Sequence, residues 1–153
     1  MNDEFWMQKA LDEADKALRE NEVPIGAVVV RDNAVIAAAH NTCVQANDPT
    51  CHAERLALAA AHEAIGALDG CTLYVTVEPC AMCAGTLLLY RIQRLVFGAY
   101  NTLTGCCGSK IDLTDHWFDA SVQTIGGVLE TACTERLGRF FGTLRMNSST
   151  EQK

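Results

Sequence analysis

Two short segments of the chain contain residue types that bind metal ions and transfer protons. His52-Ala53-Glu54 precedes a stretch rich in Ala and Leu, and Pro79-Cys80-Ala81-Met82-Cys83 follows a β-branched run. Cys80 and Cys83 are three residues apart, so on a helix they project from one face and can bind a single ion. At the start of a helix, unpaired backbone N–H groups and the helix dipole favour the thiolate, which is the ligand form of cysteine. The spacing therefore predicts a metal site.

His52, Cys80 and Cys83 together provide one imidazole and two thiolates. Zinc is the natural ion for this set, and three protein ligands leave a fourth position for water, as in catalytic zinc sites. Glu54 is the predicted partner of that water, because a carboxylate two residues from a ligand is close enough to accept and return a proton. We expect one Zn²⁺ per chain.

Simpler explanations exist for each segment taken alone. A Cys-x-x-Cys pair is often part of a hydrophobic core, and a His and a Glu on a surface helix are often a solvated pair. A structural zinc would need a fourth thiolate, but Cys51 adjoins His52 and is expected to point away, and the other cysteines stand at no ligand spacing. We predict that the remaining cysteines are core or loop residues: Cys43, Cys51, Cys71, Cys106, Cys107 and Cys133.

The two segments together resemble the signature of the zinc-dependent cytidine/deoxycytidylate deaminase superfamily, H-x-E with P-C-x-x-C. Other segments are similar to one branch of it, the tRNA-specific adenosine deaminases of the TadA type, and the resemblance covers about residues 6–145. Those segments are Glu22-Val23-Pro24-Ile25-Gly26-Ala27-Val28, Asn41, Asp48-Pro49-Thr50, Leu73-Tyr74-Val75-Thr76-Val77-Glu78-Pro79-Cys80, Phe97-Gly98-Ala99 and Thr104-Gly105-Cys106-Cys107-Gly108-Ser109.

This resemblance implies a fold, a reaction and partners. The fold would be a three-layer α/β/α cytidine deaminase-like domain, and the reaction would convert adenosine at the wobble position of a tRNA anticodon to inosine. Zinc-bound hydroxide would attack C6 of the flipped-out purine while Glu54 carries protons to N1 and to the departing amine. A homodimer would contact the anticodon loop through both subunits. The implied substrate-binding residues are Asn41, Val23, Pro24, Ile25, Pro79 and Asn101.

The chain departs from the family pattern in the loop expected to approach the nucleic acid. Asn101 replaces the usual acidic residue after Phe-Gly-Ala-x, and Cys106-Cys107 replaces a pair of small residues. The sequence after Phe140-Phe141 is also less basic than in the family. Fewer phosphate contacts and a flatter salt dependence of RNA binding are therefore expected.

The first half of the chain predicts two helices and a hairpin. Hydrophobic residues at helical spacing predict an amphipathic helix over residues 4–20, and two apolar runs, 24–30 and 35–39, flank a turn. Asp48-Pro49-Thr50 has the chemistry of a helix start, so a helix is expected over residues 52–65, with Gly66 at its end.

The second half alternates strands and helices. Strands are predicted at 72–77, 95–99 and 121–125, and helices at about 79–90 and at 129–144. This pattern predicts an α/β domain with a mixed sheet of about five strands between two helical layers. We expect one domain, residues 1–146, followed by a polar tail, residues 147–153.

The composition indicates a single globular domain. The 153 residues are 49% hydrophobic and 20% charged. No apolar run approaches the ~20 residues needed to cross a bilayer. The N-terminal segment is acidic and interrupted by charges, unlike a secretory signal. We therefore expect a soluble cytoplasmic protein with reduced thiols and no membrane association.

Charge is distributed unevenly along the chain. The net charge of −7 alone argues against nucleic-acid binding, but residues 1–90 contain 5 basic and 13 acidic side chains whereas residues 91–153 contain 7 and 6. A polyanion is therefore expected to meet the later part of the chain, around Arg91, Arg94, Lys110, Arg136, Arg139 and Arg145.

Two alternatives to a tRNA deaminase stay open. A deaminase of a free base or nucleoside, of the guanine or cytosine type, shares the zinc motif and fits the acidic net charge. A non-catalytic, zinc-stabilised binding module is the other, although such a module has no use for Glu54 beside the metal.

Overall fold

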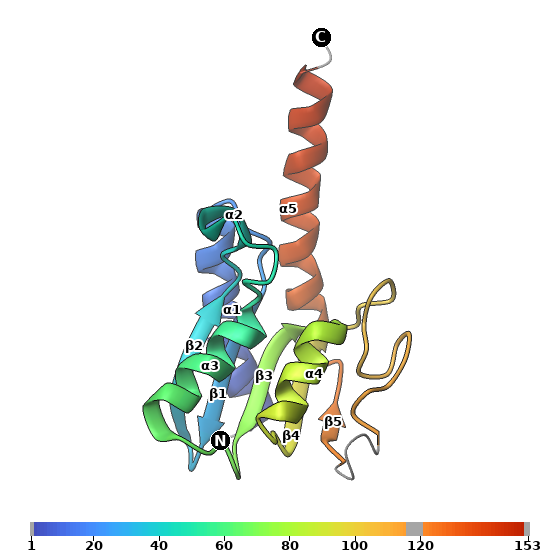
Figure 1. Ribbon diagram of the computed structural model, residues 1–153. Coiled ribbons are helices and arrows are strands. Elements are labelled where there is room, and N and C mark those ends of the chain that lie inside the picture. Colours follow the sequence, from blue (N-terminus) through green and yellow to red (C-terminus); the bar gives the residue numbers. More distant parts are fainter. Residues whose placement is uncertain (1, 116–120, 152–153) are drawn as a thin grey trace.

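A five-stranded mixed sheet forms the centre of the computed structural model, which describes residues 2–115 and 121–151, with side chains as far as residue 144 (Figure 1). The strands are β1 (Gly26–Arg31), β2 (Ala34–His40), β3 (Thr72–Val77), β4 (Arg94–Ala99) and β5 (Gln123–Ile125). Their order in the sheet is β2-β1-β3-β4-β5. β1 pairs antiparallel with both its neighbours, whereas β3, β4 and β5 are parallel. The predicted mixed sheet is confirmed.

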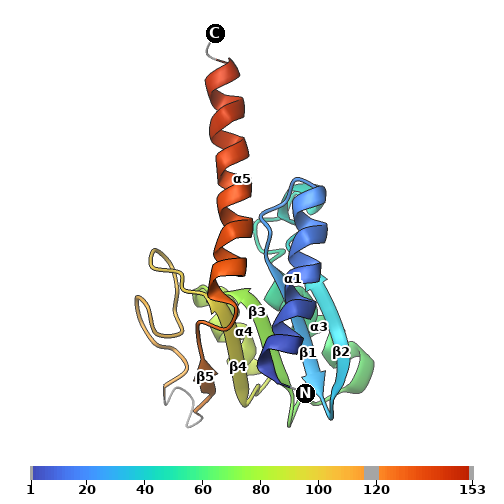
Figure 2. The same ribbon diagram turned by 180° about the vertical axis from the view of Figure 1, so that it is seen from behind.

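Helices cover both faces of the sheet. α3 (Ala53–Ile65) and α4 (Ala81–Leu89) lie on one face, and α1 (Asp3–Arg19) and the start of α5 (Glu130–Glu151) lie on the other (Figures 1 and 2). Each face has its own apolar cluster, with Leu58 and Leu87 in one and Trp6 and Met7 in the other. The three-layer α/β/α architecture is therefore confirmed.

The sequence explains how α1 begins and how closely it packs. The Asn2 side chain accepts a hydrogen bond from the backbone N–H of Phe5 (3.0 Å), and Asp3 and Glu4 complement the helix dipole in the first turn. At Gly26 in β1, a Cβ atom would overlap the carbonyl oxygen of Ala10, so glycine is required for this approach. α1 thus rests directly on the sheet.

The expected hairpin joins β1 to β2. Asp32 and Asn33 form its turn with positive φ values of 52° and 58°. This is the type I′ geometry, whose twist matches that of the flanking strands and which Asp and Asn tolerate better than most residues.

Two elements differ from expectation. α5 ends at Glu151 rather than near residue 144, so it includes most of the expected tail and projects well beyond the sheet (Figure 1). Residues 139–151 contain no proline that would stop a helix. The short helix α2 (Cys43–Ala46) was not predicted, because the groups that support its first turn come from distant parts of the chain.

The topology brings four segments to one edge of the sheet. The carboxyl ends of the parallel strands β3 and β4 lie there, and so do the start of β1 and the end of β2, since β1 is antiparallel to both β2 and β3. The backbone N–H of Asn41 bonds to the carbonyl of Ile25 (3.1 Å), and that of Glu78 bonds to the carbonyl of Ala99 (2.9 Å). Crevices at the carboxyl ends of such strands commonly bind ligands.

Over the described ranges, none of the helices has the length and apolar character to span a bilayer.

Candidate metal centre and active site

The starts of α3 and α4 bring the three predicted ligands together at this sheet edge. His52 is the N-cap residue of α3, Cys80 is the N-cap residue of α4, and Cys83 lies in the first turn of α4. Nδ1 of His52 is 3.7 Å from Sγ of Cys80 and 3.6 Å from Sγ of Cys83. One ligand atom from each residue lies within 4.8 Å of the others, and among the described residues no further cysteine joins the group.

The electrostatics of this cluster favour a bound cation. Hydrogen bonds from the Cys83 thiol and from the His52 ring lower the pKa of Cys80 to about 3, and burial only partly opposes them. Donation to Cys80 and burial raise the pKa of Cys83. Cys80 therefore favours the thiolate, and zinc binding would require Cys83 to lose its proton as well. Two thiolates and an imidazole at this separation fit Zn²⁺.

Glu54 lies in the first turn of α3 and is 4% exposed. Its Oε2 is buried and has no hydrogen-bond partner among the described residues. Burial raises the pKa of Glu54 to about 7, although the nearby His52 charge opposes the shift. An unpaired buried carboxylate oxygen lowers the stability of the fold, so its presence points to a function. A pKa near neutrality suits a group that gives and takes protons.

Comparisons with known proteins agree with this geometry. Residues 1–99, which include both ligand segments, match the family described as the cytidine and deoxycytidylate deaminase zinc-binding region. The chain belongs to this deaminase family. It is therefore an enzyme of the hydrolytic deaminase class.

Relatives within the family indicate a particular branch. The tRNA-specific adenosine deaminase of Bacillus subtilis (strain 168) is 42% identical, over 99% of this chain and 96% of that protein. The tRNA-specific adenosine deaminase of Haemophilus influenzae is 41% identical, over 98% of this chain and 89% of that protein.

Solved structures of two deaminases are similar to this chain. A tRNA:A34 deaminase structure, from work on A-to-I editing at the wobble position of transfer RNA, superimposes with a TM-score of 0.82 at 39% identity, covering 87% of this chain and 99% of that one. A guanine deaminase from Bacillus subtilis gives 0.63 at 37% identity, covering 67% of each chain. The expected cytidine deaminase-like fold is confirmed.

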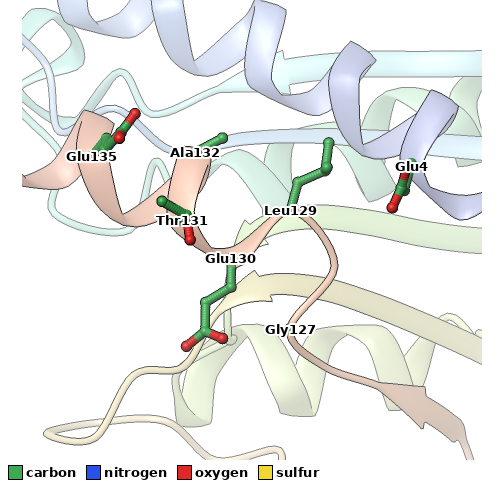
Figure 3. Close-up of a pocket in the computed structure, with 7 residues that line it drawn as sticks. All are labelled: Glu4, Gly127, Leu129, Glu130, Thr131, Ala132 and Glu135. Carbon is green, nitrogen blue, oxygen red and sulfur yellow. The ribbon is translucent and has the colours of Figure 1, made fainter.

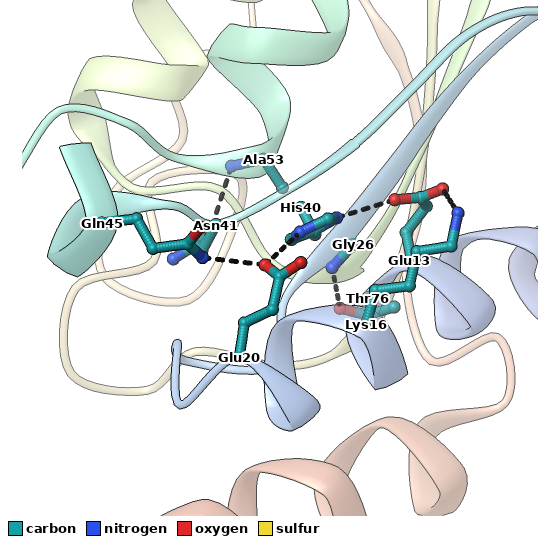
Figure 4. Close-up of polar contacts among 9 residues, drawn as sticks. All are labelled: Glu13, Lys16, Glu20, Gly26, His40, Asn41, Gln45, Ala53 and Thr76. Atoms are coloured by element: carbon teal, nitrogen blue, oxygen red, sulfur yellow. Dashed lines mark hydrogen bonds and ion pairs between the residues drawn. The ribbon is translucent and has the colours of Figure 1, made fainter.

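Asn41 directly follows β2 and supports the start of α3. Its Oδ1 accepts a hydrogen bond from the backbone N–H of Ala53 (2.8 Å), next to His52 (Figure 4). The sequence assigned this helix start to Asp48-Pro49-Thr50, and that assignment is wrong. Asp48 instead accepts hydrogen bonds from the N–H and hydroxyl of Thr50, closing its own turn. Asn41 thereby fixes its own orientation and the ligand beside it.

A polar network holds the residue before Asn41. The two ring nitrogens of His40 each lie 2.8 Å from a carboxylate oxygen, one of Glu13 in α1 and one of Glu20, the residue after α1 (Figure 4). Gln45 of α2 also donates to Glu20 (2.8 Å). The network ties the end of β2 to α1 and α2.

The other expected substrate residues lie at the same sheet edge. Val23 and Ile25 are partly exposed ahead of β1, whereas Pro24 and Pro79 are buried. Asn101, after β4, uses its side chain within its own turn, where Oδ1 accepts from the N–H of Thr104 (3.0 Å) and Nδ2 donates to the Thr104 hydroxyl (2.9 Å). Asn101 therefore shapes its loop.

Two buried carboxylates were missed by the sequence interpretation. Glu22 and Glu78 are both 1% exposed. Glu22 accepts hydrogen bonds from the backbone N–H groups of Val44 and Gln45, at the start of α2. A charged residue directly beside a predicted buried strand was the available signal, because an acidic side chain there needs partners inside the fold.

Two arginines expected to face a polyanion are already paired within the chain. Arg94 makes a bidentate contact with Asp3, at 2.8 and 2.7 Å, and Arg136 bonds to Asp15 at 3.1 Å. Sequence spacing did not reveal these partners on α1, and the expected contact of the two guanidinium groups with RNA stays a prediction. The side chain of Arg145 lies outside the described residues.

The pocket of about 550 Å³ in Figure 3 is separate from this chemistry. It lies at the start of α5 and includes Glu4, Glu130 and Glu135 among its lining residues. These residues are on the α1–α5 side of the sheet, whereas the ligand cluster is at the starts of α3 and α4. The acidic lining has no metal-ligand cluster within the described residues.

Proposed function

We propose that this chain hydrolyses adenosine to inosine and ammonia at the wobble position of a tRNA anticodon. One observation carries the proposal: the His52, Cys80 and Cys83 cluster lies beside a buried, unpaired Glu54 oxygen in a chain 42% identical, over nearly its whole length, to a tRNA-specific adenosine deaminase. The cluster supports hydrolytic chemistry, and the relatives support the substrate.

His52, Cys80 and Cys83 would hold one zinc ion per chain, and bound zinc supplies an acidified water as the nucleophile. Glu54 would take one proton from the attacking water and pass it to N1 of the purine, and it would then carry a second proton, from the hydroxyl formed at C6, to the amine that departs as ammonia. Its buried position excludes bulk water from the transfer. The consumed water provides the oxygen of inosine.

Asn41 is the best-placed side chain to orient the purine. Its Oδ1 is occupied by the N–H of Ala53, so its Nδ2 is left as a donor, and Nδ2 has no partner among the residues the structure describes. A donor fixed in this way can bond to a ring nitrogen of the base. Val23, Pro24, Ile25 and Pro79 lie at the same edge and would form the apolar walls, and Asn101 would act through its loop.

We also propose that the protein is a homodimer and that it acts in the cytoplasm, where tRNA is processed. Leu89, at the end of α4, is 78% exposed and offers an apolar surface that a second copy would cover. Light scattering on the purified protein should give twice the chain mass, and a monomeric mass at micromolar concentration would contradict the dimer.

A deaminase of free guanine is the second candidate, because the guanine deaminase structure shares 37% identity over 67% of the chain. The deciding experiment incubates the zinc-loaded protein with an anticodon stem-loop that carries wobble adenosine and, separately, with free adenosine, guanine and cytidine. Inosine in the stem-loop and no ammonia from the free compounds is expected. Ammonia from guanine alone would overturn the proposal.

A further inference from the structure

A buried carboxylate next to the metal ligands accepts hydrogen bonds from one loop. Glu78 directly follows β3 and precedes Pro79-Cys80. Its Oε2 accepts from the backbone N–H groups of Cys107 (3.2 Å) and Ser109 (3.0 Å), and its Oε1 accepts from the N–H of Asn101 (3.3 Å) and from the Ser109 hydroxyl. All these donors belong to residues 101–109, which we call the 101–109 loop.

The loop closes tightly around this carboxylate. A Cβ atom at Gly105 would overlap Oε2 of Glu78 and the carbonyl oxygen of Asn101, so glycine is required there. The N–H of Cys106 also bonds to the carbonyl of Pro79 (2.9 Å), which joins the loop to the residue before the ligand Cys80. The loop is therefore fixed against the start of α4.

The Glu78 carboxylate and the backbone N–H groups of the loop are hydrogen-bond partners for each other. A buried carboxylate is unfavourable unless its oxygens accept hydrogen bonds, and a buried backbone N–H without an acceptor is unfavourable as well. Gly105, Cys106 and Cys107 form the buried side of the loop. Without Glu78, the buried N–H of Cys107 and the N–H groups of Asn101 and Ser109 would lose their acceptor, and this part of the loop would have to open toward water.

The outer side of the same loop faces solvent near the metal centre. Thr102 and Thr104 are exposed, and Leu103 is 82% exposed. Proteins recognise unpaired RNA by apolar contacts and hydrogen bonds to splayed bases, and these side chains can supply both. The Asn101 side chain holds this outer turn, and Glu78 holds the base of the loop.

We propose that Glu78 is a positioning residue for the RNA substrate. Its carboxylate holds the 101–109 loop so that the outer turn contacts the nucleotides beside the reactive adenosine. The inference rests on the proposed function, since it takes an anticodon loop as the substrate. Because Glu78 is buried and acts through the loop, its loss weakens substrate binding more than it slows the chemical step.

Glu78→Gln tests this proposal, because the amide keeps the size of the side chain but directs an NH₂ group toward the loop donors. Binding of the wobble-adenosine stem-loop, measured in a Glu54→Ala background to prevent turnover, should weaken roughly tenfold. KM should rise by a similar factor, with kcat at saturating RNA little changed. Zinc content should be unchanged, and the amides of Cys107 and Ser109 should exchange hydrogen faster.

Two further variants control this test. Asp3→Asn disrupts a carboxylate whose Arg94 and Tyr74 partners lie away from the loop, so it should lower the melting temperature without changing stem-loop affinity. Ser109→Ala removes one hydroxyl donor and one hydrogen bond to Glu78, so it should weaken binding by a smaller factor. If Glu78→Gln fails to fold, Ser109→Ala decides the question.

Several results would overturn the proposal. The first is stem-loop affinity equal to that of the parent in Glu78→Gln, or in Ser109→Ala if Glu78→Gln does not fold. The second is an equal loss of affinity in Asp3→Asn, and the third is loss of zinc in Glu78→Gln. Unchanged amide exchange would show that the carboxylate does not hold the loop. If the parent protein neither binds nor deaminates the stem-loop, the proposed function itself fails, and amide exchange still reports separately on the loop.

Discussion

The ligand cluster and the loops around it are built by different means. Each half of the cluster depends on local spacing: His52 and Glu54 are two residues apart at the start of one helix, and Cys80 and Cys83 are three apart at the start of another. The fold then brings the two halves together across 28 and 31 residues of sequence. The surrounding loops depend on partners far away in sequence. Glu78 bonds to residues 23–31 positions further along, and Asn41 bonds to Ala53.

This difference separates chemistry from recognition. Local spacing on a helix pairs the proposed ligands Cys80 and Cys83 and sets the proposed proton carrier Glu54 beside His52. We expect the loops to determine which base reaches that centre, and the proteins similar to this chain include both a tRNA-specific adenosine deaminase and a guanine deaminase. Substitutions in the cluster should therefore abolish chemistry, whereas substitutions in the loops should change substrate binding.

Cys80→Ala should have the largest effect. It removes one of three ligands, and two ligands do not hold zinc at catalytic occupancy, so both metal content and turnover should be lost. Metal analysis after dialysis measures this. Cys43→Ala is the matched control, because Cys43 is a nearby thiol outside the cluster and should keep its zinc. Full metal content in Cys80→Ala would show that the ligand assignment is wrong.

Glu54→Gln should leave zinc in place and reduce kcat by about 10²- to 10⁴-fold, the usual contribution of a general acid and base. The amide has the same size as the carboxylate but cannot carry the proton. Single-turnover assays of inosine formation measure the loss. Glu63→Gln, at an exposed position on the same helix, should behave like the parent. Activity within a few-fold of the parent in Glu54→Gln would exclude its role in proton transfer.

The cluster could be predicted from sequence because each of its contacts is short in sequence or carries a strong chemical signature. The sheet followed from alternating apolar runs, and the hairpin turn followed from Asp32-Asn33. The supports of the loops were less accessible. Nothing local marks Glu22 as the acceptor for α2. Asp48 lies closer in sequence to the start of α3 than Asn41 does, although Asn41 makes the bond to α3.

Helix ends and ion pairs show the same limit. α5 continues to Glu151, and no proline after residue 144 stops it, although the polar composition of these residues is typical of a tail. Arg94 and Arg136 are basic residues of the kind expected on an RNA-facing surface. In the folded chain they form ion pairs with Asp3 and Asp15 on α1. Such pairing depends on tertiary packing, which spacing along the chain does not encode.

Substitutions at Asn41 can separate the support of α3, which uses Oδ1, from the proposed substrate contact, which uses Nδ2. Asn41→Asp keeps an oxygen that can accept from the N–H of Ala53 but removes the Nδ2 donor, whereas Asn41→Ala removes both. Asn41→Asp should keep the bond to Ala53 and lower kcat/KM for the stem-loop by roughly 10- to 100-fold. Asn41→Ala should show that loss together with a drop in stability of about 1 kcal/mol. Equal kcat/KM in Asn41→Asp and the parent would limit Asn41 to a structural role.

The smallest effect is expected from the basic side chains that the fold leaves available. Arg139 is exposed and makes no ion pair with the described residues, whereas Arg136 is held by Asp15. If Arg139 contacts a phosphate, Arg139→Ala should lower the slope of log K against log salt by somewhat under one unit, with the largest loss of stem-loop affinity at low salt. Arg136→Ala should instead lower the free energy of unfolding by up to about 1 kcal/mol and leave the salt slope unchanged. Fluorescence titrations of the stem-loop at several salt concentrations measure both variants. Identical slopes in the parent and in Arg139→Ala would move the RNA-facing surface away from α5 and leave recognition to the loops beside the metal centre.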